Sequence, residues 1–174
     1  GEDEKIVFYV GAKAFVKGAR GLVLSMEKLW NDGVKARLVL AGGMTLEFED
    51  FWKKQEGVVK ENTIVLDRIE ESEKQDLFDA GDIFSMVSTS ESFGIVYLEA
   101  WMYKLPVIGA DIDVIKEIID DGEDGYTVGF DNIDQIAQKI RTLFSDDELR
   151  EKMGRSGYEK VMSEYTWGKK FEIL

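Results

Sequence analysis

The sequence of 174 residues contains no cysteine and no histidine. Without cysteine the chain has neither a disulfide framework nor thiolate chemistry. Without histidine, imidazole acid–base catalysis, Ser-His-Asp triads and most transition-metal sites are excluded. Any chemistry must therefore come from carboxylates, lysine, arginine, hydroxyl groups and the backbone.

Positive charge and long apolar runs are also scarce. Lys and Arg number 22 against 35 Asp and Glu, which gives a net charge of −13. This excess argues against a nucleic-acid surface or an anionic membrane as the general partner, but not against a small anion held by a local site. No apolar run has membrane-spanning length. We expect no secretory signal, no membrane contact from this domain and a cytoplasmic location.

Hydrophobic residues make up 44% of the chain and charged residues 33%, which suits one globular domain with a full-sized core. Apolar runs predict strands at 5–10, 36–43, 63–67, 82–88, 105–110 and 126–130. Amphipathic segments predict helices at 19–33, 46–57, 71–81, 94–103, 112–120, 133–144 and 146–165. This alternation predicts an α/β fold, a Rossmann-like parallel sheet of about six strands with helices on both faces. Ligands of such folds bind beyond the carboxyl ends of the strands.

The loop that joins the first strand to the first helix lies at that edge. Gly11 and Gly18 would let its backbone turn and approach a ligand closely. Lys13, Lys17 and the helix N-terminus together favour an anion. The loop matches neither the dinucleotide fingerprint nor a Walker loop, so an ordinary turn with two solvated lysines is the alternative.

The segment after the fourth strand carries two carboxylates eight residues apart, Glu91 and Glu99. Glu99 lies within an otherwise apolar helix, where an unpartnered buried carboxylate would be costly. The amides of Phe93, Gly94 and Ile95 are expected to be unpaired at the N-terminus of this helix. A nucleotide sugar would satisfy both needs, with its diphosphate on the amides and its hydroxyls on the acids. Alternatively, Glu91 caps the helix and Glu99 pairs with a lysine.

Four segments in order carry a family resemblance: ESFGIVYLEA, KLPVIGADI, DGEDGYTV and DELREKMGRSGYEKV. Together they resemble the nucleotide-sugar-binding C-terminal domain of glycosyltransferase family 4, whose members are retaining enzymes of the GT-B fold. The resemblance covers nearly the whole chain. It implies that residues 1–174 form a single donor-binding domain, one half of a GT-B fold, taken from a longer chain. The missing N-terminal domain would bind the acceptor.

The resemblance also implies roles for individual residues. Glu91 would bond hydroxyls of the donor sugar, and Glu99 those of the ribose. Lys17 matches the family lysine on the diphosphate, while Arg68 and Ile69 match the stretch that frames the base. The candidate catalytic residues are thus Glu91 and Lys17. The candidate donor-binding residues are Glu99, Phe93, Gly94, Ile95, Gly11, Lys13, Arg68 and Ile69.

One position departs from the family pattern. The family commonly has Gly-Arg at the end of the first strand, where the arginine helps to stabilise the leaving diphosphate. This chain has Gly11-Ala12. Loss of such a charge would cost about 3 kcal/mol if it resembles loss of an oxyanion-hole donor. Either Lys13 substitutes, or the donor differs, or turnover is slow.

The function implied by the resemblance is transfer of a hexose from a nucleotide-diphosphate sugar, with UDP or GDP as the nucleotide, to a hydroxyl acceptor. Retention is implied as well. We expect neither a cofactor nor a metal, because Lys17, Lys13 and the helix N-termini would supply the positive charge. One alternative is a non-catalytic, degenerate GT-B domain that acts as a binding or scaffold module. Another is half of a GT-B epimerase or phosphorylase.

Two groups of residues are expected to be structural. The aspartates of 111–134 are interpreted as turn and cap residues, because none has the spacing of a metal site. The tryptophans Trp30, Trp52 and Trp101 are expected to pack in the fold rather than to form sugar platforms. Trp167 is expected to pack the tail of the chain.

Overall fold

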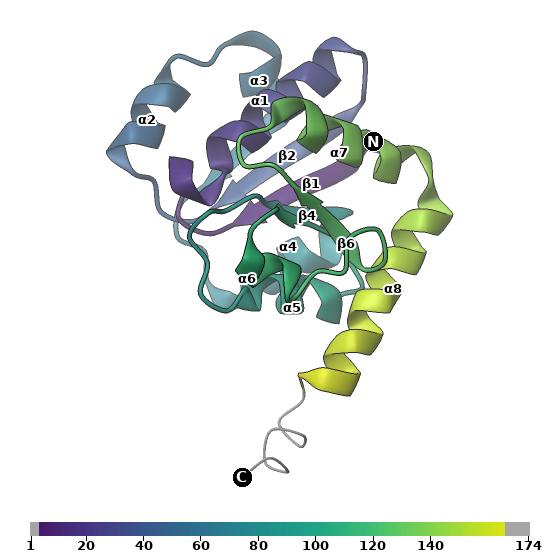
Figure 1. Cartoon of the computed structure of the whole chain (residues 1–174). Coiled ribbons are helices and arrows are strands. Elements are labelled where there is room, and N and C mark those ends of the chain that lie inside the picture. Colours follow the sequence, from purple (N-terminus) through teal and green to yellow (C-terminus); the bar gives the residue numbers. More distant parts are fainter. Residues whose placement is uncertain (1–3, 166–174) are drawn as a thin grey trace.

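The computed structural model describes residues 4–165. Its centre is a six-stranded sheet with the order β3-β2-β1-β4-β5-β6 (Figure 1), and every neighbouring pair is parallel. The strands are β1 Lys5–Val10, β2 Ala36–Ala41, β3 Thr63–Leu66, β4 Ile83–Met86, β5 Val107–Ala110 and β6 Gly125–Val128. All six strands expected from the sequence are therefore confirmed, with ends that differ by a few residues.

Helices cover the sheet on both faces (Figure 1). They are α1 Ala19–Asn31, α2 Leu46–Lys53, α3 Gly57–Asn62, α4 Glu71–Ala80, α5 Ile95–Met102, α6 Asp113–Lys116, α7 Ile133–Ser145 and α8 Asp147–Glu164, with a short 3-10 helix η1 at Phe15–Lys17. On one face α1 packs against α3 and α7, and on the other α5 packs against α8. The predicted α/β fold is confirmed. No helix within residues 4–165 is long and apolar enough to cross a bilayer.

Two helical elements were not expected from the sequence. The predicted helix at 46–57 ends at Lys53, and α3 begins at Gly57, whose φ of 52° breaks the helical path. The other element is η1, which spans only three residues. Both are too short to show a hydrophobic period: α3 buries only Val59, and η1 buries no residue at all.

The core explains why the strands were recognisable. Every residue of β4 and β5 is buried, as expected for a parallel sheet covered on both faces. Trp101 is fully buried and donates to the carbonyl of Asp124 at 2.9 Å. Trp30 is buried and donates to the carbonyl of Ala36 at 2.9 Å, while Trp52 is partly buried against the core. These three tryptophans pack as predicted, and Trp167 lies outside the described residues.

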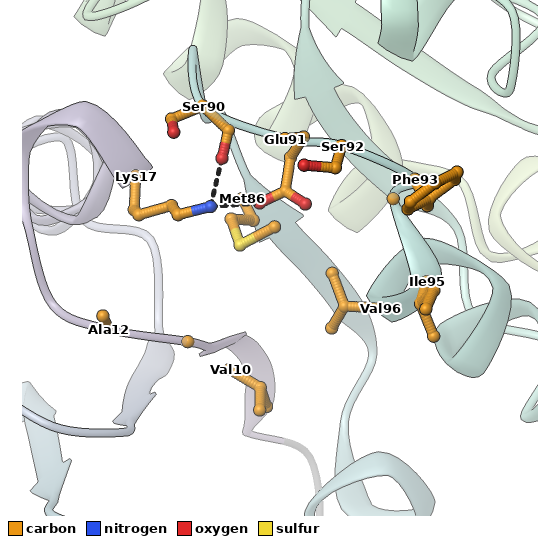
Figure 2. Close-up of a pocket in the computed structure, with 12 residues that line it drawn as sticks. Val10, Ala12, Lys17, Met86, Ser90, Glu91, Ser92, Phe93, Ile95 and Val96 are labelled. Carbon is orange, nitrogen blue, oxygen red and sulfur yellow. Dashed lines mark hydrogen bonds and ion pairs between the residues drawn. The ribbon is translucent and has the colours of Figure 1, made fainter.

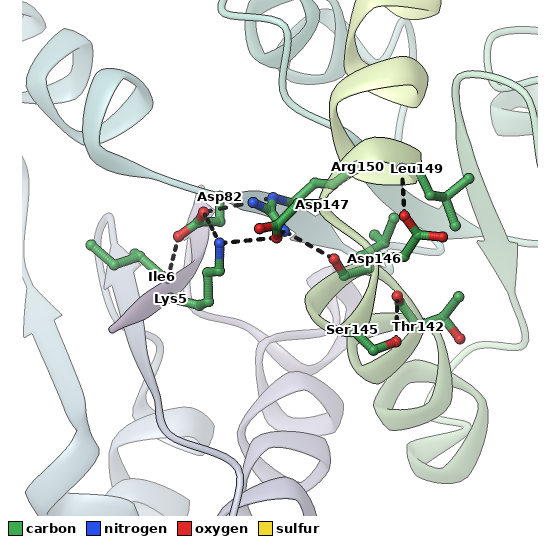
Figure 3. Close-up of polar contacts among 10 residues, drawn as sticks. Lys5, Ile6, Asp82, Thr142, Ser145, Asp146, Asp147, Leu149 and Arg150 are labelled. Atoms are coloured by element: carbon green, nitrogen blue, oxygen red, sulfur yellow. Dashed lines mark hydrogen bonds and ion pairs between the residues drawn. The ribbon is translucent and has the colours of Figure 1, made fainter. Parts of the chain in front are cut away.

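An ion-pair network ties the amino end of the sheet to the junction of α7 and α8 (Figure 3). The carboxylate of Asp82 accepts the amide of Ile6 at 2.8 Å and lies 3.7 Å from both Lys5 and Arg150. Asp147 accepts from Lys5 at 3.2 Å and from Arg150 at 2.5 Å. The network lies at the opposite edge of the sheet from the carboxyl ends of the strands, so it holds the fold without occupying the ligand edge.

Asp82→Ala tests this network. The partly buried Ile6 amide would lose its acceptor, so we expect the free energy of unfolding to fall by about 1–3 kcal/mol in urea denaturation. Asp32→Ala is the control, because the side chain of Asp32 forms an exposed pair with Arg141 and no other within residues 4–165. Its cost should stay within about 0.5 kcal/mol. Equal costs for the two variants would show that the network contributes nothing specific.

Candidate functional site

A cavity of about 360 Å³ opens where the carboxyl ends of β1 and β4 meet (Figure 2). The chain runs outward from β1 through β2 to β3 and then returns to place β4 on the other side of β1. Such a topological switch point is where doubly wound sheets bind ligands. The volume suits a small molecule. The lining residues are Val10, Gly11, Ala12, Lys17, Met86, Ser90, Glu91, Ser92, Phe93, Gly94, Ile95 and Val96.

Lys17, the last residue of η1, lines one side of the cavity, and Gly18 follows it at the start of α1. Gly18 has a φ of 80°, and a Cβ built there would lie 2.3 Å from the carbonyl oxygen of Val87. Only glycine therefore allows the start of α1 to lie against the end of β4. The carbonyl of Val16 also accepts the amide of Thr89 at 2.9 Å. These contacts place Lys17 beside the loop that follows β4.

Lys17 and Glu91, which both line the cavity, form an ion pair with Nζ and Oε1 2.7 Å apart. Lys17 also donates to the carbonyl of Ser90 (Figure 2). The two side chains are 27% and 14% exposed, respectively, so the pair is partly shielded from water. Glu91 does not cap α5, because the N-cap residue is Gly94 and no side chain bonds there. The structure thus brings together the two residues predicted to be catalytic and excludes the capping alternative for Glu91.

The N-terminus of α5 forms the facing wall. Gly94 has a φ of 58°, and a Cβ built there would lie 2.6 Å from Ile118 Cδ1. Among the hydrogen bonds of residues 4–165, none uses the amide of Phe93, Gly94 or Ile95. These amides belong to lining residues, so three unpaired donors at a helix N-terminus border the cavity that Lys17 and Glu91 also line.

Two buried tyrosines that were not singled out in the sequence bond to the backbone of cavity-lining residues. Tyr9 donates to the carbonyl of Ala12, and Tyr97 donates to the carbonyl of Met86, each at 2.5 Å. Burial, and secondarily the charge of Glu91, raise the pKa of both phenols well above the ordinary value. They therefore remain protonated donors that fix the ends of β1 and β4.

The alternative that Glu99 pairs with a lysine is confirmed, and the expectation that this carboxylate is buried within an apolar helix was wrong. Glu99 accepts from Lys74 Nζ at 2.6 Å, and its side chain is 36% exposed. It lies one helical turn after Ile95, on a side of α5 where Ile95 and Met102 are also exposed. Burial lowers the pKa of Lys74, but the hydrogen bond and charge of Glu99 outweigh it, and the pKa is raised.

Glu99 therefore does not line the cavity that holds Glu91. It lies in a separate pocket of about 60 Å³. That pocket is lined by Glu71, Lys74, Gln75, Phe78, Glu99 and Tyr103. The sequence interval of eight residues thus places the two carboxylates in different depressions of the surface.

Lys13 also does not lie where the sequence suggested. It is fully buried, and its ammonium group donates to the carbonyls of Gly42 and Leu66 at the ends of β2 and β3. Burial lowers its pKa, and the charge of Asp67 partly opposes this shift. Because Lys13 does not line the cavity, it does not substitute there for the arginine that the family pattern places at Ala12.

The remaining candidates fall into two groups. Gly11 lines the cavity, whereas Arg68 and Ile69 do not. Arg68 is exposed, and Ile69 packs partly against the core. Met86 and Ser90 are lining residues that the sequence did not mark. Their position at and just after the end of β4 was the available signal.

No cluster of three acidic residues suited to a metal ion occurs within residues 4–165. Two aspartates of 111–134 serve as turn residues, in agreement with the interpretation from sequence. Asp121 accepts the amide of Thr127 at 2.8 Å, and Asp124 accepts the amide of Asp120 at 2.9 Å.

Known proteins share this architecture. A family model described as glycosyl transferases group 1 matches residues 1–160. A sulfoquinovosyl transferase of Arabidopsis thaliana is 32% identical over 172 residues, which cover 96% of this chain and 32% of that protein. The chain spans less than half the length of the first curated relatives it matches.

Solved structures of glycosyl transferases have a similar fold. The C-terminal domain of a glycosyl transferase group 1 family protein (LpcC) from Francisella tularensis is 30% identical, with a TM-score of 0.84 over 94% of this chain and 87% of that one. A mutant of TarM from S. aureus, in complex with fondaparinux, alpha-GlcNAc-glycerol and UDP, has a TM-score of 0.86 at 21% identity. The match covers 98% of this chain and 34% of that one. The architecture is thus the Rossmann-like half of a GT-B fold.

Gly18→Ala tests the wall that carries Lys17. The added Cβ would meet the Val87 carbonyl, whereas Gly33 has a similar φ of 84° and nothing within 4 Å of its Cβ position. We expect Gly18→Ala to lower the free energy of unfolding by about 1–3 kcal/mol more than Gly33→Ala does, because only the first substitution overpacks the fold. Urea denaturation of both variants measures the difference. Equal losses would mean that the close approach at Gly18 is not required.

Proposed function

The chain belongs to the group 1 glycosyl transferases, and on that premise we propose that it is the donor-binding domain of a retaining, family 4 glycosyltransferase. The cavity between β1 and β4 would bind a nucleotide-diphosphate sugar. One observation carries the proposal: an ammonium group, a carboxylate and three unpaired helix-terminal amides border the same cavity at the switch point of the sheet.

Lys17 and the amides of residues 93–95 would hold the diphosphate. Helix N-termini and lysine both favour phosphate oxygens, and charge-assisted bonds of this kind are among the strongest in proteins. Lys17 would also stabilise the negative charge that develops on the leaving diphosphate. In this proposal the positive charge comes from the protein itself, so no metal ion or cofactor is called upon.

Glu91 would orient the transferred hexose. A carboxylate accepts several hydrogen bonds, so it can hold two neighbouring hydroxyls of a sugar ring. The catalytic contribution is positioning together with charge stabilisation, with acceptor and leaving group on the same face of the sugar. The acceptor hydroxyl would be supplied at an N-terminal domain of the same protein.

Glu99, Arg68 and Ile69 would hold the nucleoside. Lys74 bonds Oε1 of Glu99, and within residues 4–165 no side chain bonds Oε2, which would accept ribose hydroxyls. Arg68 and Ile69 follow β3 at the same edge of the sheet and would frame the base. The presence of UDP in the TarM structure supports testing UDP-sugars first, with GDP-sugars as the second class.

A non-catalytic binding module is the second candidate, because Ala12 contributes no charge to the cavity and Lys13 is bonded elsewhere. Because Lys13 does not replace the arginine of the family pattern, two explanations for Ala12 at that position remain: a different donor or slow turnover. A chain that binds no UDP- or GDP-sugar would favour the scaffold.

Lys17→Met tests the diphosphate site. Isothermal titration with a panel of UDP- and GDP-sugars should give a bound ligand for the wild-type protein and an affinity about 10- to 100-fold weaker for the variant, the usual range for a lost charged hydrogen bond. Lys53→Met is the control, since Lys53 is exposed and its one ion pair within the described residues is with Glu49. The donor site would be refuted by a Lys17→Met protein that binds as the wild type does.

Glu99→Ala tests the ribose assignment separately. The variant should bind UDP about 10-fold more weakly, because a charged acceptor of ribose hydroxyls is lost. Its affinity for inorganic pyrophosphate should not change, since pyrophosphate has no ribose. Parallel losses for both ligands, measured in the same titrations, would instead point to a general disturbance of α5.

A further inference from the structure

The ion pair between Lys17 and Glu91 carries an inference that rests on the proposed function and extends it. These are the two charged side chains among the residues that line the cavity. Each has been assigned to a different part of a donor, yet in the structure they bind one another at 2.7 Å. We propose that this pair selects ligands, disfavouring bare diphosphates and accepting diphosphates that carry a hydroxylated sugar.

Lys17 has few donors left for a ligand. An ammonium group has three, and two are used by the Glu91 carboxylate and the Ser90 carbonyl. A diphosphate must either take the third donor or displace Glu91. In both cases phosphate oxygens reach Lys17 beside a carboxylate of the same charge, and like charges so close together oppose binding.

Glu91 would lose its partner when a diphosphate displaces it from Lys17. Its side chain is only 14% exposed, so water compensates poorly for a lost ammonium group. The nearby tyrosines give no relief, because the hydroxyls of Tyr9 and Tyr97 donate to the carbonyls of Ala12 and Met86. A diphosphate without a sugar therefore leaves Glu91 short of donors.

A sugar on the diphosphate supplies the missing donors. When Lys17 turns to the phosphates, Glu91 loses its hydrogen bond from the ammonium group. The hydroxyls of the attached sugar can donate to Glu91 in its place. The ligand that results from transfer has lost its sugar and again leaves Glu91 uncompensated. The same pair thus favours entry of the donor and departure of the nucleotide diphosphate.

The test compares wild-type, Glu91→Gln and Glu91→Ala proteins by calorimetry with inorganic pyrophosphate, UDP and UDP-glucose. Both variants should bind pyrophosphate and UDP about 10-fold more tightly than the wild type, the order expected for removing one like charge in a partly exposed site. The preference for UDP-glucose over UDP should fall by a similar factor. Glu91→Asp, which keeps the charge, should show no gain.

Asp111→Asn is the control for net charge. It removes one carboxylate at the same edge of the sheet, where Asp111 pairs with the exposed Lys116. Its affinity for pyrophosphate should equal that of the wild type. Thermal unfolding of every variant establishes that the compared proteins are folded, and the two Glu91 substitutions provide independent tests of the same charge.

The possible failures are distinguishable. Pyrophosphate affinity that stays constant or falls in folded Glu91→Gln and Glu91→Ala proteins would overturn the selection by the ion pair, even if the wild type binds UDP-glucose. Conversely, the wild type could bind no UDP- or GDP-sugar while both variants gain affinity for pyrophosphate. The donor function would then be refuted, whereas the conclusion that Glu91 weakens the binding of a diphosphate would be supported.

Discussion

The cavity depends on a close approach between two loops that are distant in the sequence. The backbone at Gly18 lies against the carbonyl of Val87, and the Val16 carbonyl accepts the amide of Thr89. This contact fixes the start of α1 beside the end of β4. Lys17 and Glu91 meet because of it, and the free amides of α5 face the same space. A backbone constraint thus assembles the charged groups, which come from both sides of the switch point.

Net charge and local charge differ in this protein. The chain carries −13 overall, yet several partly or fully buried lysines are bonded internally. Lys13 binds strand-end carbonyls, Lys74 binds Glu99, and Lys160 binds Asp120 and Asp124. Lys17 differs from these three in that its carboxylate partner belongs to the cavity lining. In the proposed function, a ligand that exchanges partners with this ion pair must bond both the ammonium group of Lys17 and the carboxylate of Glu91.

The sequence predicted the sheet well because apolar strand runs and glycine stops are local signals. It missed η1 and α3, which are too short for a period to appear. It located Glu91 and the amides of α5, because both follow directly from the end of a strand. It misjudged Glu99 and Lys13, whose partners Lys74, Gly42 and Leu66 come from other elements. Side-chain pairing across the fold is a tertiary property that spacing along one segment does not encode.

The proposed function depends above all on the unpaired amides at the start of α5, which would receive the phosphates of a nucleotide sugar. Two-dimensional amide NMR of the chain during titration with UDP-glucose observes these groups individually. We expect the resonances of Phe93, Gly94 and Ile95 to undergo the largest shifts, with Gly122, which lies outside the cavity lining, unchanged. Saturable binding that leaves those three resonances in place and moves another region would refute this role of the α5 amides.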